Sequence, residues 1–408
     1  MNALPKPSPI PLPRTDVAPP LSHRTVWVLA VGCGLAVANL YFAQPLLAEL
    51  AEAFDVPAGR MGLAATLAQV GYGLGLLFFV PLGDAVERRG LIVAMLLAVA
   101  AALVAVAASP GFAWFAAGSL AVGLTTIAPQ LIVPLAATLA RPGERGRVVG
   151  MVMSGLLVGV LASRTFSGFV AARLGWRAVY LIAAGMSVTL AAVLRWLLPR
   201  SEPEGHRPPY LQLLTSLGEL LRTEPVLRQG CLFGAMSFGA MSAFWNTIAF
   251  FLAGPPYHYG TDRVGLFALV GVAGAAAASV SGRLADRVNP RWIIGGGLTL
   301  MLASYALFWA AGDQLGWLLV GVVTVDLGAQ AVHIANQTRI YALRPEVRNR
   351  LNTAYMVCFF AGGATGSAAG AFGWGRWGWS GVCAAGCLLL GVGVVGYLAT
   401  ARQTATSV

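Results

Sequence analysis

The amino-acid sequence predicts an all-α membrane protein in which twelve transmembrane helices form two six-helix pseudo-symmetric bundles. Three observations lead to this fold class. The 408 residues are 57% hydrophobic and only 11% charged, whereas about a quarter of the residues in soluble chains are charged. The apolar residues gather in runs of about 20, which is the length that crosses a bilayer. Short motifs also recur in the second half of the chain at a nearly constant offset.

Glycine, proline and charged clusters separate the apolar residues into twelve candidate helices. Each span in lipid must satisfy its own backbone hydrogen bonds, so short connections such as Ser109-Pro110-Gly111 predict antiparallel neighbours. The first run is too long for the apolar region of a signal peptide and is expected to stay as a span. The predicted helices cover residues 25–50, 61–82, 91–109, 112–139, 148–172, 177–198, 229–253, 264–282, 292–311, 316–341, 351–373 and 380–400.

The segments outside these spans predict the domain boundaries. The first 24 residues are rich in proline and predict a disordered tail. The polar stretch between the halves contains Tyr210–Arg222, which predicts an amphipathic helix on the membrane surface. The expected organisation is a tail (1–24), a first bundle (25–198), a linker (199–228), a second bundle (229–400) and a final tail (401–408).

The distribution of the 27 lysine and arginine residues predicts the orientation in the membrane. Most of them fall in one set of loops, together with both tails and the linker. By the positive-inside rule, this set faces the cytoplasm. One further arginine, Arg164, lies inside a span, and the opposite set of loops holds only Arg60, Arg173, Arg177, Arg263 and Arg376.

Repeated motifs indicate that the two halves are duplicated. The pattern R-P-x-x-R-x-R occurs at residues 141–147 and again 203 residues later, at 344–350. Gly175-Trp176 and Gly378-Trp379 repeat at the same offset. Each motif lies in the equivalent loop of a six-helix half, as expected for a duplicated architecture.

Two equivalent loops carry charges that are candidates for a gate. In the first half Asp84 is followed by Arg88 and Arg89, and in the second half Asp286 is followed by Arg287. An aspartate can accept hydrogen bonds from a helix N-terminus, and an arginine can pair with carboxylates across the cytoplasmic seam. Such contacts would hold this side shut in one state and break in the other. The alternative is a solvated charged turn.

These loops resemble a known family. Gly282-Arg283-Leu284-Ala285-Asp286-Arg287 is similar to the signature that the major facilitator superfamily carries between its eighth and ninth helices. Gly83-Asp84 with Arg88-Arg89 resembles the first-half copy. The resemblance extends to residues 38–47 and 326–339, and it covers residues 25–400. It implies the major facilitator fold and a bacterial branch of proton-driven drug or sugar efflux permeases.

Arg164 and Asp326 are the ionisable residues predicted to lie in the middle of a span. A charge near the bilayer midplane costs several kcal/mol unless it is paired or faces water, so function is its default explanation. At a rise of about 1.5 Å per residue, both lie roughly 12–15 Å below the same surface. In the resembled fold their helices lie on the same side of the interface between the halves. We expect the two to interact, directly or through water; the alternative is a static ion pair.

The predicted helix over 316–341 carries a polar stripe. Asp326, Gln330, His333 and Gln337 recur at helical spacing, and lipid would not tolerate such a stripe, so it must face protein or a watery cavity. With an unperturbed pKa of about 6.5, His333 is a second candidate proton carrier beside Asp326. The alternative for His333 is a hydrogen-bonded packing residue.

Further polar residues lie mid-span on helices that line the cavity in the resembled fold, with Gln69 and Tyr72 as weaker candidates. Amides, hydroxyls and aromatics with a single acid favour a modest-sized, neutral or amphiphilic ligand. The alternative for each residue is an interhelical hydrogen bond. The predicted substrate-binding residues are Asn39, Tyr41, Gln44, Thr126, Gln130, Trp245, Asn246, Gln330 and Gln337.

The sequence lacks the residue patterns that other functional classes require. Cys383 and Cys387 are four apart, but no neighbouring ligand completes a metal site. The glycines at 71–75 lie in a span without the lysine of a phosphate-binding loop. We therefore expect no metal, no cofactor and no nucleic-acid partner. The alternative outside transport is a membrane-embedded enzyme or a sensor, but no catalytic cluster and no soluble output domain is visible in the sequence.

The leading hypothesis is a monomeric secondary active transporter of the bacterial inner membrane, with both termini cytoplasmic. It would export a small organic compound, drug-like or sugar-like, by alternating access and proton antiport, so its partners are the substrate, protons and lipid. The alternative within transport is a facilitator or a proton symporter for a small metabolite.

Overall fold

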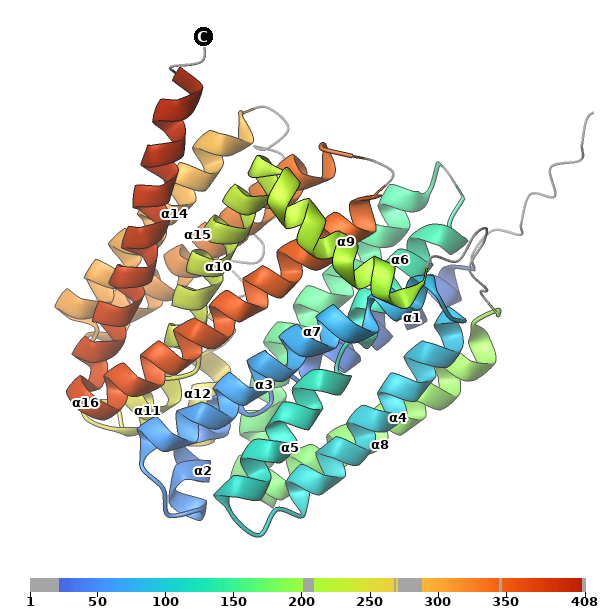
Figure 1. Cartoon of the computed structure of the whole chain (residues 1–408). Coiled ribbons are helices and arrows are strands. Elements are labelled where there is room, and N and C mark those ends of the chain that lie inside the picture. Colours follow the sequence, from blue (N-terminus) through green and yellow to red (C-terminus); the bar gives the residue numbers. More distant parts are fainter. Residues whose placement is uncertain are drawn as a thin grey trace, which may run out of the picture.

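The structure, a computed structural model, describes residues 22–141, 143–200, 209–267, 269–270, 288–344 and 347–405. Within these ranges the secondary structure is helical, without strands. Figure 1 shows the long helices running in roughly the same direction, with first-half helices on one side and second-half helices on the other. The predicted helical membrane fold is confirmed by this architecture.

The first half contains five helices that are long and apolar enough to cross a membrane, beside a broken first span. The first span consists of α1 (His23–Ala38), the 3₁₀ helix η1 (Gln44–Leu46) and α2 (Leu47–Ala53). The remaining elements are α3 (Ala58–Phe79), η2 (Pro81–Asp84), α4 (Arg88–Ala107), α5 (Phe112–Thr125), α6 (Ala128–Leu139), α7 (Arg145–Leu174) and α8 (Trp176–Leu197).

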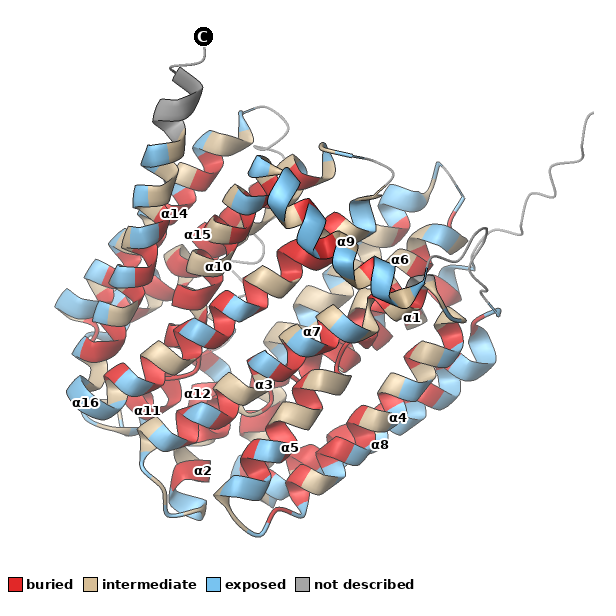
Figure 2. Ribbon diagram, viewed as in Figure 1, coloured by how far each residue is buried: buried red, intermediate tan, exposed pale blue. Residues whose placement is uncertain are grey.

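The second half follows a short surface helix, α9 (Tyr210–Thr223). α9 packs Leu213, Leu217 and Leu220 inward and exposes its polar face (Figure 2), so the predicted amphipathic helix is confirmed. The remaining described elements are α10 (Pro225–Trp245), α11 (Ile248–Ala253), α12 (Thr261–Phe267), α14 (Pro290–Ala311), α15 (Leu315–Tyr341) and α16 (Arg348–Ala405).

The helix bounds differ from the predicted spans in places. α10 begins at Pro225, four residues earlier than expected, because proline is well suited to the first position of a helix. The last two predicted spans appear as the single element α16, interrupted at Gly378, whose φ of 58° lies in the left-handed region. Most of the predicted 264–282 helix lies outside the described residues. Nine helices of the described part qualify as spans, which is consistent with twelve.

Three predicted spans are broken near their middle. The breaks fall between α1 and η1, between α5 and α6, and between α10 and α11. Pro45 and Pro129 lie just after the first two breaks, where their missing N–H groups interrupt the helical hydrogen bonds. The third break, at Asn246 and Thr247, contains no proline. Broken helices free backbone and side-chain polar groups in the interior, and these breaks carry several predicted site residues.

Two seams join the halves. α3 packs against α16, and α7 packs against α12. We call the end of the molecule with α2 and α11 the α2 end, and the end with α9 the α9 end (Figure 1). Near the α2 end, a Cβ added at Gly62 of α3 would lie 2.5 Å from the Cβ of Ala371. A Cβ at Gly168 of α7 would meet the carbonyl oxygen of Thr261. The halves are therefore in close contact at the α2 end.

The surface of the bundle is apolar where it would face lipid. Trp27, Trp196 and Trp292 are among many large hydrophobic side chains that are mostly exposed, and such a surface is suited to hydrocarbon rather than water. Figure 2 shows the buried residues concentrated where helices face one another.

We predict that Gly168→Ala loosens the seam between α7 and α12. The added methyl group would press on the Thr261 carbonyl, at a cost of about 1–3 kcal/mol. The melting temperature of the purified protein should fall. Gly150→Ala on the same helix is the control, because nothing lies within 4 Å of its added Cβ; its melting temperature should stay or rise slightly. Equal effects of the two variants would contradict the close seam.

Candidate functional site

Arg164 is buried at the centre of the site. Only 3% of this α7 residue is exposed. Its guanidinium lies over the ring of Trp245, 4.1 Å from the centroid, and over the ring of Tyr41 at 5.2 Å. Its Nε donates to Oε1 of Gln44 at 2.6 Å. Cation–π contacts and a charge-assisted hydrogen bond thus replace part of the hydration that burial removes.

Asp326 contacts the edge of the same indole. It belongs to α15, is 6% exposed, and accepts a hydrogen bond of 3.1 Å from the indole Nε1 of Trp245. Within the described residues the two charges form no direct ion pair. The contact between Arg164 and Asp326 runs through the indole, which offers its ring face to the cation and its N–H to the anion.

A series of hydrogen bonds between polar side chains starts beside Arg164 and crosses from one half to the other. Gln44 donates from Nε2 to Oδ1 of Asn246 at 2.8 Å. Asn246 donates from Nδ2 to the hydroxyl of Ser367 at 2.9 Å, and Thr66 donates to the same hydroxyl at 2.9 Å. We call these four residues the amide chain. It joins η1 and α3 of the first half to α10–α11 and α16 of the second.

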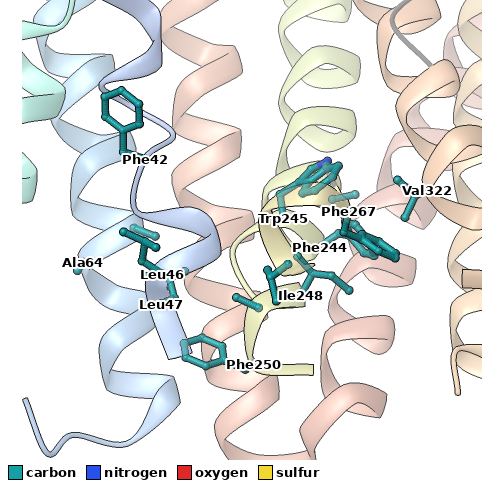
Figure 3. Packing of buried hydrophobic residues seen from close by; sticks show 14 of the residues in the cluster. Phe42, Leu46, Leu47, Ala64, Phe244, Trp245, Ile248, Phe250, Phe267 and Val322 are labelled. Atoms are coloured by element: carbon teal, nitrogen blue, oxygen red, sulfur yellow. The ribbon is translucent and has the colours of Figure 1, made fainter. Parts of the chain in front are cut away.

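Apolar packing completes the closure near the α2 end. Figure 3 shows Leu46 and Leu47 beside Ala64, with Ile248 and Phe250 of α11 approaching from the second half. These side chains belong to one buried cluster.

A hydrogen bond also joins the halves at the seam between α7 and α12. There the hydroxyl of Thr165 donates to the carbonyl of Gly265 at 3.0 Å.

A cavity of about 370 Å³ lies between the halves and has walls from both. Five predicted substrate-binding or proton-coupling residues line it: Tyr41, Gln130, Gln330, His333 and Gln337. Tyr72, a weaker candidate, also lines it. Among the lining residues that the sequence did not suggest are Met153, Ser237, Phe238, Met241, Met356, Phe359 and Phe360.

The polar stripe of α15 divides between two environments. Gln330, His333 and Gln337 face the cavity, whereas Asp326 bonds to Trp245. His333 is held by Tyr355, whose hydroxyl lies 3.0 Å from Nδ1, and its ring packs against Phe359 with centroids 4.7 Å apart. The helix therefore presents its acid and its neutral polar groups to different neighbours.

Other predicted substrate-binding residues bond within the protein. Asn39 donates to Ser187 at 3.4 Å, and the hydroxyl of Thr126 donates back to the carbonyl of Val122 at 2.6 Å. Gln44, Trp245 and Asn246 belong to the contacts around Arg164. None of these five is among the residues that line the cavity.

The predicted gating residues are described only in part. Arg88 donates from Nε to the carbonyl of Gly83 at 2.9 Å. Arg89 is buried, donates to the carbonyl of Leu198 at 2.9 Å and lies 3.7 Å from the carboxylate of Glu87. The side chain of Asp84, together with Asp286 and Arg287, lies outside the described residues.

No metal site is visible in the part of the chain that the structure describes. His, Cys, Asp and Glu side chains do not gather there in groups of three that could hold an ion. Cys383 and Cys387 are free thiols, the first buried and the second half-buried.

The comparison with known proteins agrees with this geometry. Long apolar helices in two halves with a cavity between them are the arrangement expected of a multi-pass membrane transporter. A family model described as Major Facilitator Superfamily matches residues 29–366, and again residues 256–407. The chain belongs to the Major Facilitator Superfamily, and the resemblance found in its loops is confirmed.

Relatives and solved structures agree with the family. The Uncharacterized transporter YgaY of Escherichia coli O157:H7 is 41% identical over 369 residues, or 90% of this chain and 93% of that protein. A peptide transporter, POT, crystallised with alafosfalin, has a TM-score of 0.77 at 12% identity and covers 94% of this chain and 96% of its own. A bacterial homologue of the lysosomal transporter Spinster, in an inward-facing and occupied conformation, has a TM-score of 0.72 at 14% identity, covering 93% of this chain and 96% of its own.

We predict that Thr66→Cys with Ser367→Cys forms a disulfide between the halves, because the two hydroxyl oxygens are 2.9 Å apart. The pair would be placed in a variant whose five native cysteines are replaced by alanine. Cross-linking is measured by mass spectrometry after mild oxidation. Thr66→Cys with Thr365→Cys is the control, since Thr365 is exposed and bonds to its own helix. Equal cross-linking of both pairs would contradict the amide chain.

Proposed function

We propose that the chain exports a small organic compound across a bacterial inner membrane by alternating access, with protons moving in the opposite direction. The observation that carries this proposal is the burial of Arg164 and Asp326 around Trp245, in contact with hydrogen bonds that span the two halves. Burying an ionisable group in a transmembrane interior costs free energy. Because Arg164 and Asp326 are connected to contacts between the halves, a change in their protonation would alter those contacts and hence the conformation.

The proposed orientation rests on the arginine distribution, which assigns the α9 end and both termini to the cytoplasm. In this orientation the tight seam and the amide chain close the periplasmic side. A smaller cavity of about 50 Å³, lined by Arg88, Arg350 and Leu213, shares Gln130 and Met356 with the central cavity. The central cavity would therefore load from the cytoplasmic side, as an exporter requires.

Asp326 is the proposed proton acceptor, and Arg164 is its charge partner. Protonation would remove the negative charge that faces the indole N–H and, beyond it, the guanidinium. This changes the attraction between α7 in one half and α10 with α15 in the other, and hence the stability of the closed α2 end. Substrate and proton need not share a contact, because both act on the same seam.

His333 is the second candidate proton carrier. Its hydrogen bond to Tyr355 and its place on the cavity wall also suit a group that binds the substrate. If export stops in His333→Gln while Asp326→Asn still exports in response to the proton gradient, then His333, and not Asp326, is the proton carrier.

We predict that Asp326→Asn abolishes gradient-driven export. The assay follows efflux of Nile red, a neutral dye, from cells with and without a protonophore; the rate should fall to that of cells lacking the protein, because an amide cannot gain and lose a proton as a carboxylate does. Asp313→Asn is the matched control, because Asp313 is exposed between α14 and α15. Protonophore-sensitive export by Asp326→Asn would remove this residue from the mechanism.

The same assay separates the alternatives. If the efflux rate of the native chain is the same with and without the protonophore, the protein is a facilitator. Dye accumulation driven by the gradient would indicate a symporter.

We further predict that the disulfide between Thr66→Cys and Ser367→Cys stops transport, because the α2 end can then no longer open. Dye export should stop after oxidation and return after reduction. Export that continues through the cross-linked protein would exclude opening at this seam.

A further inference from the structure

The central cavity has a largely aromatic and sulfur-containing wall. Phe238 and Phe359 stack with centroids 4.1 Å apart and planes 14° from parallel, and Phe360 packs against Tyr72 with centroids at 4.3 Å. Three methionines, Met153, Met241 and Met356, also line the cavity, together with aliphatic side chains. Flat rings and adaptable thioethers are suited to the faces of an aromatic ligand.

The polar groups of the cavity are few and neutral. They are the amides of Gln130, Gln330 and Gln337, the hydroxyls of Tyr41, Tyr72 and Ser237, and the imidazole of His333. Some are already engaged: Tyr72 accepts from Gln130 at 3.3 Å, and His333 is bonded to Tyr355. Among the described residues that line the cavity, none is Asp, Glu, Lys or Arg.

The nearest buried charges are arranged unequally around this cavity. Tyr41 lines the cavity and also lies under the guanidinium of Arg164. Asp326, in contrast, is bonded to the indole of Trp245, and neither residue lines the cavity. Arg164 does not line the cavity itself, but its guanidinium lies over a ring that does, so the ring of Tyr41 is already occupied by a cation. An organic cation in the cavity would meet repulsion without a counter-ion.

A sugar fits this wall poorly. Each carbohydrate hydroxyl that leaves water must find a partner, or its burial costs free energy. The handful of available amides and hydroxyls is too small for a molecule with a hydroxyl on nearly every carbon, and rings, thioethers and aliphatic side chains make up the remainder of the lining.

We propose that the cavity selects uncharged, flat aromatic compounds that carry one or two hydrogen-bonding substituents, and that it discriminates against organic cations and sugars. The ring stack holds the faces of the ligand, and the glutamine amides bind its polar substituents. This inference rests on the proposed function in one respect, namely that the cavity is the substrate site.

The test measures binding to the purified full-length protein by isothermal titration calorimetry, without a proton gradient. The probes are 4-phenylbenzamide, which is neutral, 4-phenylbenzoate, which is anionic, N-methyl-4-phenylpyridinium, which is cationic, and sucrose. The neutral amide should bind at least about tenfold more tightly than either ion, and sucrose should not bind. Equal or tighter binding of the cation, the anion or sucrose, or no binding of the amide, would overturn the inference.

Two pairs of variants locate the binding. Phe359→Leu should weaken the amide about tenfold, in the range expected when a stacking ring is lost, whereas Phe372→Leu, an exposed residue on the same helix, should not. Arg164→Gln should reduce the discrimination against the cation, while Arg164→Lys should keep it. Retained binding of the neutral amide shows that the two Arg164 variants are folded, and an unchanged melting temperature shows the same for the two phenylalanine variants. Unchanged discrimination in Arg164→Gln would contradict the electrostatic argument.

The outcome is distinct from that of the proposed function. Amide binding with no proton-driven export would refute antiport and leave the selectivity of the cavity intact. Proton-driven dye export without amide binding would refute the selectivity and leave antiport intact.

Discussion

The structure depends on how one positive and one negative charge are kept inside an apolar bundle. An isolated buried ion is expensive, and even a buried pair must find hydrogen bonds for its remaining donors and acceptors. Here one indole contacts both: its face receives Arg164 and its N–H donates to Asp326. Arg164 comes from the first half, whereas Trp245 and Asp326 come from the second, so the contact between the guanidinium and the indole requires the halves to stay together at the α2 end.

The chemistry of the interior is divided accordingly. Charged groups and amides bond to one another along the closed seam, whereas the cavity keeps neutral amides, hydroxyls, rings and thioethers. Under the proposed antiport, such a division would let the ligand and the proton act on one conformational equilibrium from separate positions. A ligand can shift that equilibrium only by binding its two states with different affinity, so contacts that change when the seam opens are the ones that matter.

The spans, the family and the two buried charges could be predicted from the sequence because each leaves a local signal. Arg164 and Asp326 interrupt long apolar runs, and a charge in such a run is visible without any partner. The amide chain left such a signal at Gln44 and Asn246 only, because Thr66 and Ser367 are ordinary small polar residues whose contact spans 301 positions. The role of Trp245 between the charges was missed for the same reason, although the residue itself was selected. Asn39 and Thr126 were chosen for their polarity, but polarity alone does not distinguish a ligand contact from a helix–helix or backbone hydrogen bond.

The central claim is that Arg164 and Asp326 act as one unit on closure of the α2 end. Its most direct test is a double-mutant cycle on the rate at which cysteines at positions 66 and 367 cross-link, since that rate reports closure even when transport is lost. Arg164→Gln, Asp326→Asn and the double variant would be compared with the unmodified background. The account predicts that the double variant is no slower than the slower single variant, with a coupling of about 1 kcal/mol or more. If the fold-changes in cross-linking rate caused by the two single substitutions multiply in the double variant, the two residues act independently, and the claim is contradicted.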